Sequence, residues 1–162
     1  MNFLSLFDMQ QKLDTKIETQ HKLENESLIE RKILALLVEV GELANETRCF
    51  KFWSLKAPAP IDVILEEYVD GIHFILSLGL EINVDPSLKL EEIHAEHSVT
   101  EQFLSVYQTI TVFKEQQTLQ VYKKMFEEYL CLGHLLGFTK EQIEHAYVSK
   151  NEVNHERQKQ GY

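Results

Sequence analysis

Apolar residues recur at steps of three and four along most of this chain, which is the spacing of an amphipathic α-helix. Leu6, Met9 and Leu13 follow it in the first such segment, and alternation typical of β-strands is absent from the sequence. We therefore predict an all-α fold, a helical bundle of about six helices with antiparallel neighbours. The helices are expected from about Asn2 to His21, Ser27 to Arg48, Ile61 to near Gly79 and Thr118 to Leu136, with two more starting at Ser98 and Thr139.

Local signals mark several helix boundaries. Ser98-Val-Thr-Glu101 and Thr139-Lys-Glu-Gln142 have the form of a capping box, and Gly137 suits a left-handed helix end. The polar stretch 81–97 contains Asp-Pro and is predicted to be a connector with at most a short helix. Since no repeat or low-complexity tract divides the 162 residues, a single domain spanning 1–162 is expected.

Charge and composition disfavour several classes of function. The formal net charge of -10 argues against a nucleic-acid partner, because binding to phosphate backbones needs a basic surface. No apolar run approaches the roughly 20 residues of a membrane helix, and the N-terminus turns polar too early for a signal peptide. Because no run of this kind occurs, we predict no membrane contact. Cys49 and Cys131 lack metal-site spacing, and we predict that both thiols are reduced and that the protein is cytoplasmic.

Two of the predicted helices carry a pair of acids three residues apart, at the edge of the apolar stripe. These are Glu39 and Glu42 on the second helix, and Glu67 and Asp70 on the third. Burying unpaired carboxylates is costly, so four converging acids need a neutralising partner. An oxygen-only set suits Mg²⁺, with Mn²⁺ as a substitute, better than zinc or copper. The pattern predicts a metal site formed by these four acids.

Other interpretations of the acids remain open at this point. A single Glu-x-x-Glu is common in helices, so Glu39 or Glu67 can instead pair with a lysine at a helix edge. A second alternative is a non-catalytic helical interaction protein whose acids are surface charge. Di-iron bundles use Glu-x-x-His, which occurs at Glu91–His94 and Glu152–His155, but both lie in polar stretches without an apolar stripe. Gly41 and Gly71, beside the acids, are expected to let a ligand approach the backbone.

Four further segments accompany the acid pairs, whose halves are separated by 24 residues. They are Met9-Gln10-Gln-Lys-Leu13-Asp14, Arg48-Cys-Phe-Lys51-Phe-Trp53-Ser, Gly71-Ile-His73-Phe74 and the tail from Lys150 to Tyr162. Over nearly the whole chain, this arrangement resembles the MazG-like superfamily of all-α nucleoside triphosphate pyrophosphatases. The tail and Trp53 resemble, more narrowly, its dimeric dUTPase family.

The resemblance implies a dUTP diphosphatase that hydrolyses dUTP, and as a further candidate dUDP, with Mg²⁺ bound by the acid pairs. It implies attack of water at the β-phosphorus, for which we take Glu39 as the catalytic base. It also implies a homodimer whose sites draw on both subunits. Phe74 would pack against the deoxyribose, with His73 in a supporting position. The remaining implied substrate contacts are Gln10, Asp14 and Trp53 at the base, and Lys51, Lys150, Asn151, Asn154 and Arg157 at the phosphates.

Two features leave alternatives within this interpretation. We expect Asn in this family where the chain has Asp14, and an ionised Asp only accepts hydrogen bonds. Asp14 can accept the N3–H of uracil, but donation to a base carbonyl is left to Gln10 or a backbone amide. A dCTP or broad-specificity dNTP pyrophosphatase is therefore the alternative. For Trp53, the alternative is simple packing in the core.

Overall fold

The structure, a computed structural model, describes residues 1–93 and 96–161. These residues form helices without any strand, which confirms the predicted all-α bundle. The helices are α1 (Phe3–His21), α2 (Ile29–Thr47), α3 (Ile61–Glu81), α4 (Val99–Glu115), α5 (Leu119–Leu135) and α6 (Lys140–Lys159). No helix in the described part of the chain is long and apolar enough to cross a membrane.

Most predicted boundaries are confirmed by the caps. Ser98 and Thr139 both form complete capping boxes, and Gly137 takes a φ of 87° after α5. Helix α3 continues past Gly79 to Glu81. Gly79 therefore lies inside the helix, where its missing side chain makes room for the ring of Tyr122, whose Cζ would lie 2.8 Å from an added Cβ.

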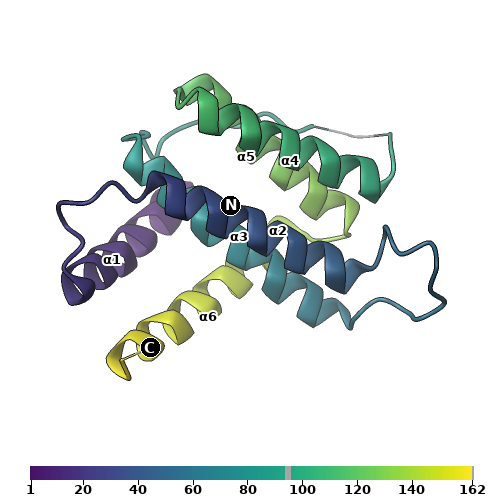
Figure 1. Cartoon of the computed structure of the whole chain (residues 1–162), viewed down its shortest axis with the longest axis horizontal. Coiled ribbons are helices and arrows are strands. Elements are labelled where there is room, and N and C mark those ends of the chain that lie inside the picture. Colours follow the sequence, from purple (N-terminus) through teal and green to yellow (C-terminus); the bar gives the residue numbers. More distant parts are fainter. Residues whose placement is uncertain (94–95, 162) are drawn as a thin grey trace.

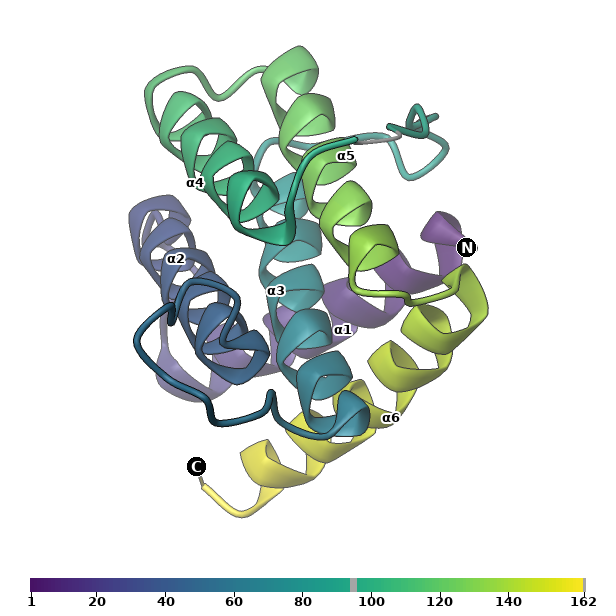
Figure 2. The same ribbon diagram turned by 90° about the vertical axis from the view of Figure 1, so that its right-hand side faces the viewer.

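Helix α3 lies in the middle of the bundle, as Figures 1 and 2 show. It packs against α2, α1 and α6 and touches α5, while α4 and α5 pair with each other and α4 also contacts α2 (Figure 2). Eleven of its residues are buried, so α3 is the element around which the other helices are arranged. Side chains on α3 can therefore meet side chains from α1, α2 and α6.

Two tyrosines fix α3 against α5. The rings of Tyr68 and Tyr129 stack at 4.8 Å, and each hydroxyl donates to the other residue's carbonyl, at 3.1 and 2.9 Å. This packing requires glycine on both helices, because a Cβ on Gly71 would lie 2.6 Å from Cζ of Tyr129, and one on Gly133 would lie 2.6 Å from Cζ of Tyr68. The prediction that Gly71 admits a ligand is therefore wrong: the space beside Gly71 is filled by Tyr129.

Candidate metal centre and adjoining pocket

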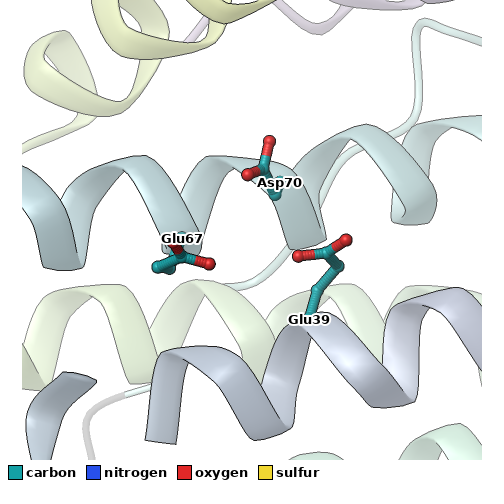
Figure 3. A group of neighbouring side chains, drawn as sticks. All are labelled: Glu39, Glu67 and Asp70. Carbon is teal, nitrogen blue, oxygen red and sulfur yellow. The ribbon is translucent and has the colours of Figure 1, made fainter. Parts of the chain in front are cut away.

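Three of the four predicted metal ligands come together. Helices α2 and α3 pack side by side, and Glu39 on α2 faces Glu67 and Asp70 on α3 (Figure 3). One carboxylate oxygen from each lies within 4.8 Å of the others, and each side chain is partly buried. Figure 3 shows Glu39 reaching from its own helix towards the helix that carries Glu67 and Asp70. This spacing lets one ion contact all three carboxylates.

The electrostatics of this acid cluster favour a cation. Burial, together with the charges of Asp70, Glu42 and Glu67, raises the pKa of Glu39 from 4.5 to about 7. Burial and the neighbouring acids also raise the pKa of Glu67, and burial raises that of Asp70 although Lys150 opposes the shift. The acids therefore repel one another, and their oxygen-only donor set fits a hard divalent cation such as Mg²⁺ or Mn²⁺.

The fourth predicted ligand, Glu42, is exposed and lies outside this group of three. Its charge still contributes to the raised pKa values of Glu39 and Glu67, so it lies near the rim of the cluster. Gly41, next to it, faces the hydroxyl of Tyr107, 3.3 Å from where a Cβ would be.

Lys150 contacts the acid cluster directly. Its Nζ lies 2.7 Å from Asp70 Oδ2 and 2.9 Å from Glu66 Oε1. Hydrogen bonding to Lys150 and the charge of Lys150 lower the pKa of Glu66, which was not among the predicted site residues. In the sequence, the one sign of its role was its position one helical turn before Asp70. The structure adds that α6, which carries Lys150, packs against α3. The lysine predicted to bind phosphate is thus placed at the acids.

A pocket of about 380 Å³ adjoins the acid cluster. Glu39 and Asp70 line one end of the pocket, and Lys32 and Ser77 line the other. Lys32 lies seven residues from Glu39 on α2, and Ser77 lies seven residues from Asp70 on α3, which is about 10 Å of helix in each case. The pocket is also lined by Gln10, Asp14, His73, Phe74, Asn154 and Arg157. A separate cavity of about 370 Å³ lies beside Leu130, and none of the described residues that line it is a predicted site residue. The first pocket therefore gathers residues that are far apart in sequence.

Gln10 ties one wall of the pocket together. It is 3% exposed; its Oε1 accepts from the Tyr147 hydroxyl at 2.7 Å and from His73 Nδ1 at 2.8 Å. Its Nε2 donates to Asp14 Oδ1 at 2.7 Å. Burial lowers the pKa of His73 to about 3, so the ring is neutral and its Nε2 is left as a buried acceptor without a hydrogen-bond partner among the described residues. Tyr147, whose ring stacks on that of His73 with centroids 4.1 Å apart, was not among the predicted site residues.

Two predicted substrate contacts lie elsewhere. Lys51 and Trp53 belong to the segment 48–60 between α2 and α3, and none of the described residues that line the pocket comes from this segment. Trp53 is 65% exposed and packs edge-on against Phe50 and Phe52, so core packing is excluded as its role. The indole lies on the surface beside Phe52, which is 95% exposed.

The predicted C-terminal contacts lie on α6. Asn154 and Arg157 line the pocket, whereas Asn151 is buried and is not among its lining residues. The di-iron interpretation gains no support here. Glu152 is exposed and does not belong to the acid cluster, and His94 lies outside the described residues.

An all-helical bundle with carboxylates clustered at one end of a ligand-sized pocket has the form of the all-α nucleoside triphosphate pyrophosphatases. A search of curated proteins found no match. The family model described as dUTPase matches residues 2–162, so the chain belongs to this helical dUTPase family. It is accordingly a hydrolase that acts on nucleoside triphosphates, which sets aside the non-catalytic interpretation.

Proposed function

We propose that the protein is a Mg²⁺-dependent dUTP diphosphatase that converts dUTP to dUMP and pyrophosphate. The observation that carries this proposal is the convergence of Glu39, Glu67 and Asp70, with oxygens within 4.8 Å, at one end of a pocket of about 380 Å³. Membership of the dUTPase family supports the substrate class. Mn²⁺ is a substitute cation, and dUDP is a second candidate substrate.

Glu39, Glu67 and Asp70 would hold the cation, with Glu42 at the rim. When bound, the cation neutralises negative charge that develops on the phosphate oxygens. Glu39 is the proposed base, which takes a proton from the water that attacks the β-phosphorus, with dUMP as the leaving group.

Positive and donor groups of α6 would contact the phosphates. Arg157 and Asn154 line the pocket, and Lys150 lies beside Asp70. We include Asn151 and Lys51 in the proposed phosphate contacts, Lys51 through movement of its loop or from a second subunit. Together these groups orient the triphosphate and offset part of its charge.

The order of residues along α3 supports one direction for the nucleotide in this proposal. Asp70 lies at the acid end, His73 and Phe74 follow one turn later, and Ser77 lies at the far end. With the phosphates at the acids, the sugar lies against Phe74, which would disfavour a 2′-hydroxyl, and the base reaches Gln10 and Asp14. This order of residues would hold the nucleotide in one orientation.

We further propose a homodimer in which the partner completes the site. The segment 48–60 exposes Phe52, Trp53 and Leu55, and such apolar exposure marks an interaction surface. Since Trp53 lies outside the pocket of its own chain, the partner's copy would cover the base. Cys49, which is exposed, and Cys131, which is buried, form no disulfide in the described structure, and this fits the reducing cytoplasm that we propose as the protein's location.

One assay tests the function. The protein is incubated with Mg²⁺ and, separately, dUTP, dUDP, dCTP, dTTP or UTP. Nucleoside monophosphate is followed in each case, together with pyrophosphate from the triphosphates or phosphate from dUDP. We expect turnover of dUTP and its loss in Glu39→Gln. A preference for dCTP would indicate the alternative specificity, and no turnover of any nucleotide would refute the proposal.

A further inference from the structure

The far end of the pocket is organised by Lys32, a residue of α2. Its side chain is only 12% exposed, and its Nζ lies 2.6 Å from Glu81 Oε1, 3.3 Å from Asp14 Oδ2 and 3.5 Å from Glu18 Oε1. These partners come from α1 and α3, so one ammonium joins three helices. Lys32, Asp14 and Glu18 all line the pocket.

The charges at this end define what it can accept. Burial alone lowers the pKa of Lys32, but Asp14 and Glu81 outweigh that effect and raise it, so the ammonium stays charged. Three carboxylates face one cation, and the end keeps a net negative charge. It therefore repels phosphate and favours a neutral group that presents hydrogen-bond donors.

Asp14 is the acceptor that such a group would meet. Its Oδ1 accepts a hydrogen bond from Gln10 Nε2 at 2.7 Å, and its Oδ2 accepts hydrogen bonds from Ser77 Oγ and Lys32 Nζ. A carboxylate has about four acceptor sites, so three donors fix its orientation and leave about one site for a ligand. Asp14 keeps 13% of its side chain exposed, and it lines the pocket.

We propose that Lys32 is a positioning residue for base selection, which holds the Asp14 carboxylate as an oriented acceptor at the far end of the pocket. With Asp14 opposite position 3 of the base, the pocket favours a pyrimidine with an N3–H donor, such as uracil, over cytosine, whose N3 carries a lone pair and whose only donor is its 4-amino group. This inference rests on the proposed function, since the phosphates at the acid cluster direct the base to this end.

The test replaces Lys32 with Met, which keeps a long side chain but removes the charge. We expect KM for dUTP to rise about tenfold or more, the scale of a lost charge-assisted hydrogen bond, with kcat within about threefold of wild type. The preference for dUTP over dCTP should shrink by a similar factor. Binding of dUMP and dCMP, measured by calorimetry, should show the same loss of preference without turnover.

Two further variants make the result interpretable. Lys12→Met makes the same chemical change at an exposed lysine paired with Asp8, and should leave both KM values unchanged. Ser77→Ala removes a donor to Asp14 without changing charge, and it should also reduce the preference for dUTP over dCTP. This variant keeps the test valid if Lys32→Met does not fold.

The outcomes separate this inference from the proposed function. If wild type hydrolyses dUTP but Lys32→Met and Ser77→Ala keep its full preference over dCTP, the role of Lys32 is refuted and the function stands. An equal fall of kcat for both nucleotides at unchanged KM would show a merely structural lysine and also refutes the role. If wild type hydrolyses no nucleotide, both proposals fail.

Discussion

Replacing Glu39 with Gln should stabilise the metal-free protein while it removes activity. In the folded chain Glu39 holds its proton more tightly than in the unfolded chain, because burial and three neighbouring acids raise its pKa from 4.5 to about 7. The stability associated with this proton is present below pH 4.5 and is lost as pH rises to about 7. Above pH 7 the ionised side chain destabilises the fold, and glutamine does not.

The size of the effect follows from the shift. A rise from 4.5 to about 7 corresponds to at most about 3.4 kcal/mol. Because Glu39 is partly exposed and solvent screens its charge, we reduce this to about 1–2 kcal/mol. For a chain of this length, that raises Tm by about 3–6 °C.

Thermal unfolding in a chelator at pH 8 and at pH 4.5 measures this difference. Glu39→Gln should melt above wild type at pH 8 and near it at pH 4.5, whereas with Mg²⁺ wild type should gain stability by binding and the variant should gain less. Glu152→Gln, at an exposed position of α6, is the matched control and should not change Tm at either pH. A Glu39→Gln protein that melts below wild type at pH 8 without metal would show that the acid cluster is not electrostatically strained.

Three other changes probe the site and the bundle. Phe74→Ala should narrow the gap in kcat/KM between dUTP and UTP, and an unchanged gap would remove its role against the 2′-hydroxyl. Trp53→Ala and Glu39→Gln should each be inactive alone, yet their mixture should recover roughly a quarter of wild-type activity if every site combines Glu39 of one subunit with Trp53 of the other; no recovery after subunit exchange would refute shared sites. Gly71→Ala should lower the free energy of unfolding by about 1–3 kcal/mol, because the new methyl overlaps Tyr129. Urea unfolding should show this as a lower midpoint, and an unchanged midpoint would contradict this packing.

The helices could be predicted because their evidence is local. Apolar spacing gives the buried faces, and Ser98 and Thr139 form caps with residues only three positions away. The acids of α2 and α3 were visible for a similar reason, because carboxylates at the edge of an apolar stripe are unusual. Their meeting needed only that two neighbouring helices pack side by side.

The features that were missed depend on contacts distant in sequence. Lys32 follows Arg31 in a charged helix start and looks like a solvated lysine, yet one of its partners, Glu81, is 49 residues away. Lys150 and Glu66 are separated by 84 residues. The role of Gly71 was misinterpreted because the ring beside it is that of Tyr129 on α5. The sequence around Gly71 does not indicate that this ring packs there.

The surface position of Trp53 has a practical consequence. It is the one tryptophan of the chain, and its indole is 65% exposed, far more than any core aromatic. Intrinsic emission excited at the red edge of protein absorption therefore reports on the segment 48–60 rather than on the bundle. A shift of this emission to shorter wavelength would record the moment at which the segment becomes covered, without any label and while the helices stay folded.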